Sequence, residues 1–276
     1  MSAIQWTDGN QRVSISMEDG IADVRMIRTD KMNALDPHMF AGLAAAIEYL
    51  GSLPGLRVVV LSGEGRAFCA GLDMESMASG GSDPSRKLTD RSHGIANHPQ
   101  HVCWGWRELP VPVIAAAHGV ALGGGFQVLS GADIRFVHPD TKLAILELKW
   151  GLVPDMAGLP LWRGIVRDDV LRELSYTARI FTGEEGKALG FVTHVSADPL
   201  AEAMALAREI AGKNPDAIRG MKRLANVAQF ESAEALLMAE SVEQDAIIRT
   251  PNQREAVMSV FEKRTPVYVD PVPLKQ

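Results

Sequence analysis

The chain has 276 residues, of which 46% are hydrophobic, which is sufficient for one large core with a smaller helical appendage. Its formal net charge of −6 argues against a nucleic-acid surface, and no stretch reaches the roughly 18 uninterrupted apolar residues that a membrane span needs. Residues 1–8 lack the basic and apolar blocks of a signal peptide, so we expect a cytoplasmic protein with neither nucleic-acid nor membrane partners.

The first half of the chain predicts strands alternating with helices. Residues 13–18 and 21–28 are short β-branched runs on either side of an Asp19-Gly20 turn, which predicts a hairpin. Asp36 and the proline after it are typical of a helix start, and apolar residues continue at helical spacing up to Leu50.

Three later runs, 57–62, 111–116 and 133–137, are apolar on both faces, as in strands buried in a parallel sheet. Strands separated by helices predict right-handed crossovers and a layered α/β core.

The remainder of the chain is predicted to be mainly helical. Helix starts are expected at Thr182, where Glu185 completes a capping-box pattern, and at Pro199, Pro215 and Pro251. We therefore divide the chain into an α/β core, residues 1–198, and a helical module, residues 199–276. Residues 77–84 are predicted to form a mobile loop and 266–276 a loose terminus.

The cysteines, Cys69 and Cys103, are far apart and show neither a CxxC nor a Cys/His ligand spacing. We expect two reduced thiols that serve in packing, and no metal site.

The glycine run 123–125 is the first candidate functional segment. Glycine lets a backbone approach a ligand closely, and a helix that starts just after the run would point free N–H groups at an anion. A tight strand-to-helix turn without a ligand is the alternative. A second glycine turn, 63–71, follows a predicted strand, but Phe68 is too bulky at the sixth position of a dinucleotide-binding fingerprint.

Five segments share the order and spacing of motifs in one known family. They are 33–35 (Asn-Ala-Leu), 68–73 (Phe-Cys-Ala-Gly-Leu-Asp), 118–125 (His-Gly-Val-Ala-Leu-Gly-Gly-Gly), 131–134 (Gly-Ala-Asp-Ile) and 261–264 (Phe-Glu-Lys-Arg). Together they resemble the crotonase superfamily, also called the enoyl-CoA hydratase/isomerase family. The resemblance implies a ββα spiral core, a C-terminal helical module that forms trimers or hexamers, and acyl-CoA chemistry with no separate cofactor, because coenzyme A is part of the thioester substrate.

By this resemblance, the backbone N–H groups of Leu72 and Gly124 would form an oxyanion hole for the thioester oxygen. Fixed amides stabilise the negative charge of an enolate without any particular side chain.

The resemblance also points to three acid/base positions, occupied here by Gln127, Glu147 and Asp155. In enoyl-CoA hydratases the first two would be glutamates, and a glutamine cannot accept a proton at neutral pH. An aspartate at the position of Asp155 is a feature of dienoyl-CoA isomerases, although these also carry an aspartate where Gln127 stands. Hydration, isomerisation and a noncatalytic acyl-CoA-binding protein therefore remain open. Without the resemblance, a loop salt bridge for Glu147 and a turn cap for Asp155 are the favoured interpretations.

A further alternative is dehalogenase-type chemistry, in which an aspartate matching Asp155 attacks the substrate and a histidine near His98 or His101 acts as base. Those enzymes carry tryptophan at the position of Glu147, which favours surface or packing roles for His93, His98 and His101.

Coenzyme A phosphates need cations that an acidic chain must supply locally. By resemblance, the substrate-binding residues are Lys31, Met32, Ala70, Asp73 and Lys263, the last of which would reach the ligand of a neighbouring subunit. Each lysine is equally compatible with an ordinary solvated side chain.

Overall fold

A computed structural model describes residues 4–78 and 87–271 of the chain. The strands are β1 (Ile4–Thr7), β2 (Val13–Glu18), β3 (Ile21–Met26), β4 (Val58–Gly63), β5 (Val113–Ala117), β6 (Val120–Leu122), β7 (Ile134–Val137), β8 (Lys142–Ala144) and β9 (His194–Val195). The α-helices are α1 (Pro37–Ser52), α2 (Met74–Ala78), α3 (His98–Glu108), α4 (Gly124–Ser130), α5 (Gly158–Trp162), α6 (Asp168–Thr177), α7 (Gly183–Leu189), α8 (Pro199–Ala211), α9 (Pro215–Val227), α10 (Ala233–Ile247) and α11 (Pro251–Phe261). Two short 3-10 helices are η1 (Thr29–Lys31) and η2 (Glu147–Trp150).

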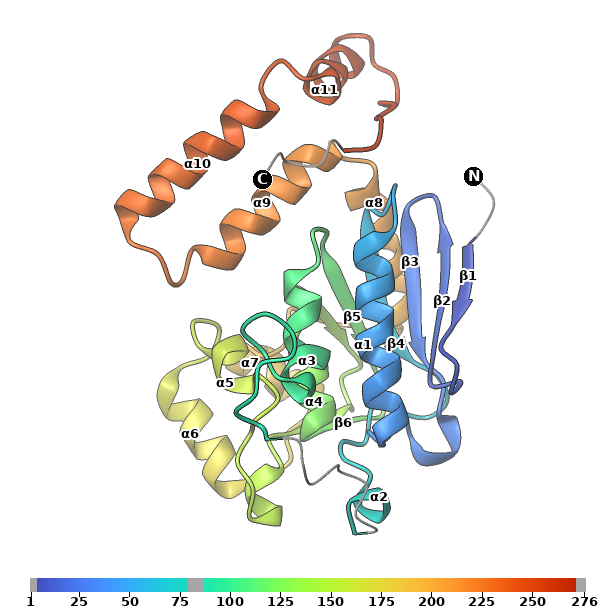
Figure 1. Ribbon diagram of the computed structural model, residues 1–276, viewed down its shortest axis with the longest axis vertical. Coiled ribbons are helices and arrows are strands. Elements are labelled where there is room, and N and C mark those ends of the chain that lie inside the picture. Colours follow the sequence, from blue (N-terminus) through green and yellow to red (C-terminus); the bar gives the residue numbers. More distant parts are fainter. Residues whose placement is uncertain (1–3, 79–86, 272–276) are drawn as a thin grey trace.

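Among the described residues, seven strands form one sheet in the order β1-β2-β3-β4-β5-β7-β9, of which Figure 1 labels β1 to β5. Strands β6 and β8 pair in a small second sheet. The β1-β2-β3 pairs are antiparallel, and every later pair is parallel. The predicted hairpin, the helix after Asp36 and the three buried strands are confirmed within one to two residues. The fold is the α/β class that the sequence predicts.

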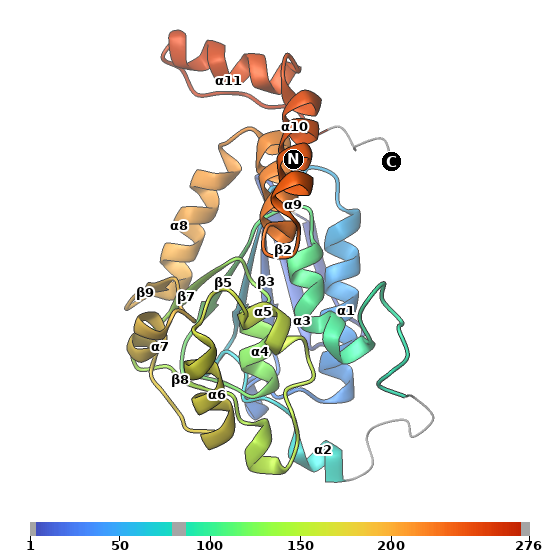
Figure 2. The same cartoon turned by 90° about the vertical axis from the view of Figure 1, so that its left-hand side faces the viewer.

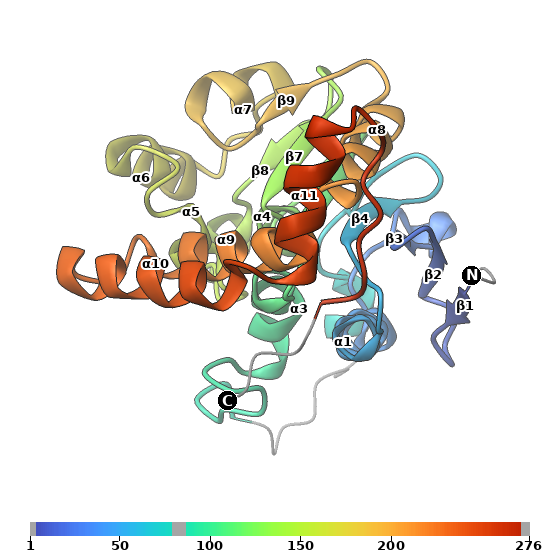
Figure 3. The same cartoon turned by 90° about the horizontal axis from the view of Figure 1, so that it is seen from above.

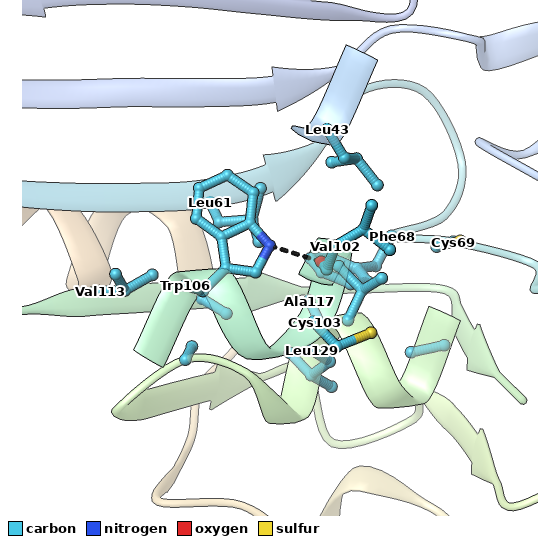
Figure 4. Packing of buried hydrophobic residues seen from close by; sticks show 14 of the residues in the cluster. Leu43, Leu61, Phe68, Cys69, Val102, Cys103, Trp106, Val113, Ala117 and Leu129 are labelled. Atoms are coloured by element: carbon cyan, nitrogen blue, oxygen red, sulfur yellow. Dashed lines mark hydrogen bonds between the residues drawn. The ribbon is translucent and has the colours of Figure 1, made fainter. Parts of the chain in front are cut away.

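Two hydrophobic clusters cover the two faces of the main sheet. The larger lies on the side of α1, α3 and α4, and the smaller joins the sheet to α8, which Figure 2 shows on the opposite side. Figure 4 shows the larger cluster, in which the fully buried Trp106 ring packs beside Leu61 while its Nε1 donates to Val102 O at 2.9 Å. This partner satisfies the indole N–H, which would otherwise be a costly unpaired donor in the core.

The last three helices extend beyond one end of the sheet, with α10 running back beside α9 and α11 leading off from it (Figures 1 and 3). Helix α8, which our division assigns to the helical module, packs against β4 and β5. The division at residue 198 therefore stays a prediction. The module is joined to the core by Lys222 on α9, whose buried ammonium group lies 2.5 Å from Asp133 Oδ2.

All three proline helix starts are confirmed, each with a capping side chain: Asp198, Asn214 and Thr250. Two expectations about loops differ. Residues 77–78 belong to the end of α2, while 79–84 lie outside the described residues. The terminus is not loose up to Pro271, because Val269 exchanges two hydrogen bonds with Asn252.

We predict that Lys222→Met lowers the free energy of unfolding by about 2 kcal/mol, because it leaves the Asp133 carboxylate half-buried without its cation. Urea denaturation of the full chain measures this change. Lys213→Met, at an exposed lysine that pairs with Glu209 on the surface, is the matched control and should change stability by less than about 0.5 kcal/mol. Equal effects of the two substitutions would contradict the anchoring role.

Candidate active site

The loop before α2 runs beside β6 in parallel register. Cys69 and Ala121 form a parallel bridge, in which Cys69 N donates to Val120 O at 3.0 Å and Leu122 N donates to Cys69 O at 3.1 Å. Beyond this bridge the segments stay close, because a Cβ on Gly71, the residue before Leu72, would lie 3.8 Å from Gly124 N. The two residues predicted to form the oxyanion hole therefore come from adjacent backbones.

This pairing requires glycine at two positions. A Cβ on Gly71, whose φ is +90°, would lie 2.5 Å from Leu122 O and 3.8 Å from Gly124 N. A Cβ on Gly125 would lie 2.5 Å from Cys69 O. Both distances to oxygen are well inside van der Waals contact, so a side chain at either position would force the two segments apart.

The N–H groups of Leu72 and Gly124 are free donors at this junction. Within residues 4–78 and 87–271, neither N–H donates a hydrogen bond, although the adjacent amides of Asp73 and Gly123 both do. Two unpaired donors on neighbouring backbones are what a negatively charged oxygen needs.

Glu147 lies next to this junction at the start of η2. A Cβ on Gly123 would lie 3.5 Å from Glu147 Oε1, and Gln127 Nε2 donates to the same oxygen at 2.5 Å. Gln127 is fully buried and Glu147 is 6% exposed. The structure thus brings two of the three predicted acid/base positions into direct contact.

The carbonyl end of Gln127 is fixed by the backbone of the loop before α5. Its Oε1 accepts hydrogen bonds from Met156 N at 3.0 Å and Gly158 N at 2.9 Å. The intervening Ala157 adopts the left-handed conformation, with φ at +72°, which turns both N–H groups toward one oxygen. The orientation of the amide is set by these donors, so its amino group must face Glu147.

The second oxygen of Glu147 has no such partner. Glu147 Oε2 is buried and accepts no hydrogen bond from the described part of the chain. Burial raises the pKa of Glu147, the Gln127 hydrogen bond opposes that shift, and the charge of Asp155 adds to it. The result is a desolvated carboxyl group with one oxygen that no donor among the described residues satisfies.

Asp155, the third predicted position, sits in the loop between η2 and α5. Its side chain is exposed, yet the protein around it removes enough water to raise its pKa. Its charge acts on both Glu147 and Cys103, which places it on the same side of the molecule as the Gln127–Glu147 pair.

Two of the predicted substrate-binding residues, Asp73 and Lys31, already have protein partners. Asp73 pairs with the partly buried Arg28 at 2.7 Å and accepts hydrogen bonds from the N–H groups of Glu75 and Ser76. Burial acts to raise the pKa of Asp73, but these partners together lower it. Lys31 pairs with Glu75 at 3.0 Å on the surface. Asp73 therefore fixes the loop that carries Leu72. Sequence reasoning missed its partner Arg28, because Arg28 belongs to none of the motifs.

Met32 and Ala70 lie together, because Ala70 N donates to Met32 O at 2.9 Å. Lys263 does not join them within one chain: Figures 1 and 2 place α11 at the far end of the molecule from α2 and β6. Its expected contact with the ligand of a second subunit stays a prediction.

The histidines of the dehalogenase alternative face other rings. His98 lies against Phe40, and His101 stacks on His93 at 4.1 Å between ring centroids. The cysteines are buried and reduced, as expected. No helix among the described residues combines the length and apolar character needed to cross a bilayer.

Comparisons with known proteins identify the family. A family model described as enoyl-CoA hydratase/isomerase matches residues 16–271. The chain is 32% identical to the peroxisomal Delta(3,5)-Delta(2,4)-dienoyl-CoA isomerase of Arabidopsis thaliana, over 87% of this chain and 89% of that protein. It is 28% identical to the mitochondrial methylglutaconyl-CoA hydratase of Homo sapiens, over 90% of this chain and 74% of that protein.

A solved structure agrees with this assignment. The enoyl-CoA hydratase of Bacillus anthracis is 26% identical and superimposes with a TM-score of 0.84, over 94% of this chain and 99% of that one. The chain belongs to the enoyl-CoA hydratase/isomerase family, as its motifs predict. The reaction is not fixed by these matches, because the relatives are named both as hydratases and as isomerases.

We predict that Gln127→Glu makes stability depend on pH. The new carboxylate would face Glu147 at hydrogen-bond distance, so the pair would share one proton and the pKa of that proton would be raised. The folded state then holds the proton more tightly than the unfolded state does. The variant therefore keeps its stability at about pH 5 and loses stability as the pH rises toward about 8. The loss is about 1.4 kcal/mol for each unit by which the folded-state pKa exceeds the unfolded-state pKa.

Thermal unfolding from about pH 5 to about pH 8 measures this effect. The double variant Gln127→Glu with Glu147→Gln exchanges the two groups and is the matched control, which should lose the added pH dependence. A single variant that unfolds like the parent at every pH would show that the two side chains are not in contact.

Proposed function

We propose that this protein is an acyl-CoA isomerase that shifts a carbon–carbon double bond of an enoyl- or dienoyl-CoA thioester by proton transfer. The observation that carries this proposal is the hydrogen bonding of Gln127. Its carbonyl oxygen is held by two backbone N–H groups and its amino group is directed at Glu147. The Gln127–Glu147 pair therefore has one ionisable carboxylate, whereas activation of water by two carboxylates would need both members to be ionisable.

The thioester oxygen would be bound between Leu72 and Gly124. Both N–H groups are free and belong to adjacent backbones, so they are positioned before the substrate arrives. Removal of a proton from the acyl chain sends an electron pair to this oxygen, and fixed donors in a site with little water stabilise the resulting enolate.

Glu147 would take the proton through Oε2. Its raised pKa makes it a stronger base than an exposed glutamate, and the hydrogen bond from Gln127 to Oε1 leaves the other oxygen for the substrate. Gln127 is thus a positioning residue. Asp155, whose pKa is also raised, would deliver a proton at another carbon as the enolate collapses. To reset the site, the exposed Asp155 would take a proton from solvent and Glu147 would release the proton that it took from the substrate.

The substrate's coenzyme A moiety would lie along Met32 and Ala70, with Lys31 and Lys263 as the candidate cations for its phosphates. Lys31 is exposed and its pKa is raised by the hydrogen bond that it donates to Glu75, so a phosphate would compete with that surface carboxylate. Trimer or hexamer formation through the helical module belongs to the same proposal, because Lys263 of one chain can serve only the site of another.

Hydration is the second candidate, since Glu147 alone can still activate a water molecule and the human relative is named as a hydratase. The two reactions differ in what is added to the substrate. In deuterated water, isomerisation introduces deuterium without other change, whereas hydration adds the elements of a heavy-water molecule.

We predict that Glu147→Gln lowers kcat by about 10² to 10⁴ on the active member of a panel of 2-enoyl-, 3-enoyl- and dienoyl-CoA esters. Asp155→Asn should slow dienoyl isomerisation more than exchange of the first proton with deuterium. The parent's pH–rate profile should be bell-shaped, because Glu147 must be deprotonated and Asp155 protonated. The pKa values of both carboxyl groups are raised, so the rising limb, which Glu147 sets, should lie above the usual range of a glutamate.

Mass spectrometry of the products in deuterated water measures all three outcomes. Glu231→Gln, at an exposed carboxylate in the helical module, is the control and should match the parent. A parent without activity on the whole panel, or a Glu147→Gln variant as active as the parent, would instead support a noncatalytic acyl-CoA-binding protein.

We predict that Gly124→Pro lowers kcat about 10² to 10³ below that of Gly124→Ala. Both substitutions place a Cβ about 2.9 Å from Leu35 Cδ1 and Met156 Sδ, but only proline removes the N–H. Proline is also tolerated at the first position of a helix. Steady-state kinetics of the two folded variants isolates the amide, and equal rates would remove Gly124 from the oxyanion hole.

A further inference from the structure

Three side chains that the proposed reaction does not use meet where α1 and α3 pack against each other. Glu48 projects from α1, His93 from the loop before α3, and His101 from the first turns of α3. One ligand atom of each, a carboxylate oxygen and two ring nitrogens, lies within 4.8 Å of the other two. Two imidazoles and a carboxylate are the ligand types that Zn²⁺ and similar divalent ions prefer.

His101 is the unusual member of this cluster. It is only 7% exposed, and neither ring nitrogen has a hydrogen-bond partner within the described ranges of the chain. A buried polar group without a partner costs about 1 to 3 kcal/mol, and such groups are uncommon in native proteins. Burial, with the neighbouring His93 and His98, lowers the pKa of His101 to about 4, so its ring is neutral and carries a free lone pair at physiological pH.

The spacing between His93 and Glu48 fits an intervening ion better than a direct contact. His93 Nε2 and Glu48 Oε1 are 3.7 Å apart, which is too long for a hydrogen bond. Two metal–ligand bonds of about 2.1 Å span up to about 4.2 Å, so an ion bound to both atoms fits this separation.

The other nitrogen of His93 has a partner of its own. His93 Nδ1 lies 2.9 Å from Ser92 Oγ. When Nδ1 donates to this hydroxyl, the lone pair of Nε2 faces Glu48, and ligating histidines commonly have their second nitrogen held in this way.

We propose that Glu48, His93 and His101 bind one divalent transition-metal ion, with Zn²⁺ as the probe that suits their ligand chemistry, and that water completes the coordination. The rings of His93 and His101 stack with an interplanar angle of 15°. A metal ion binds in the plane of an imidazole, so binding turns one ring until both lone pairs meet at the ion.

Such an ion would fasten the loop that contains His93 to two helices of the core. Helix α3 packs on both α1 and α4, and α4 carries Gln127. The ion would therefore stabilise the wall behind the candidate active site without contacting the substrate, and its binding can be measured in the absence of any acyl-CoA.

The test uses the full chain after treatment with a chelator. Calorimetric titration with Zn²⁺ should show one ion bound per chain, and Co²⁺ in its place should give the visible absorption of a site with nitrogen and oxygen ligands. Glu48→Gln and His93→Gln change partly or largely exposed side chains, so both variants should fold, and each should weaken Zn²⁺ binding at least tenfold. His38→Gln, at an exposed histidine near the start of α1, is the matched control and should bind like the parent.

Absence of saturable binding at one ion per chain would overturn the site. So would equal affinity of the parent, Glu48→Gln and His93→Gln, or a loss in His38→Gln as large as theirs, because either result would assign the ion to other surface groups.

Discussion

The candidate site depends on the close parallel approach of two backbone segments, the loop that ends at Leu72 and the strand that ends before Gly124. Gly71 and Gly125 permit this approach, since a Cβ at either would lie 2.5 Å from a backbone oxygen of the facing segment. Arg28 supports it from outside by pairing with Asp73. The approach leaves the N–H groups of Leu72 and Gly124 without a partner among the described residues. Glu147 lies beside them, because a Cβ on Gly123 would be 3.5 Å from its Oε1.

The electrostatics of the candidate site depend on the neutral amide of Gln127, which lies beside the Glu147 carboxylate. Gln127 can accept two backbone N–H groups and also donate to Glu147, which no deprotonated carboxylate can do. Glu147 is therefore the one ionisable member of a buried pair. Burial of the Glu147 carboxylate destabilises its charged form and so raises its pKa. The same destabilisation favours the transfer of a proton to Glu147.

Much of the fold was predictable because its signals are local. Asp36, Asn214 and Thr250 cap helices within three residues of themselves, and the apolar runs around Val60, Ile114 and Phe136 form buried strands. The end of α2 was not predicted. Nor was the fixed conformation of the residues before Pro271, because it depends on hydrogen bonds that join Val269 to Asn252 and Arg57, which are distant in sequence. The histidines carried no local signal of a cluster, since Glu48, His93 and His101 come from three separate segments.

The sequence by itself determined the family and the α/β class, because motif order and local periodicity are properties of the chain. It also predicted three acid/base positions, Gln127, Glu147 and Asp155. Only the tertiary structure decided how those positions relate. The turn at Ala157 points two N–H groups at Gln127, Gln127 then faces Glu147, and Glu147 keeps one oxygen free. Such relations depend on hydrogen bonds between residues 20 to 31 positions apart, and the direction of a side chain is set by the partners that folding brings to it.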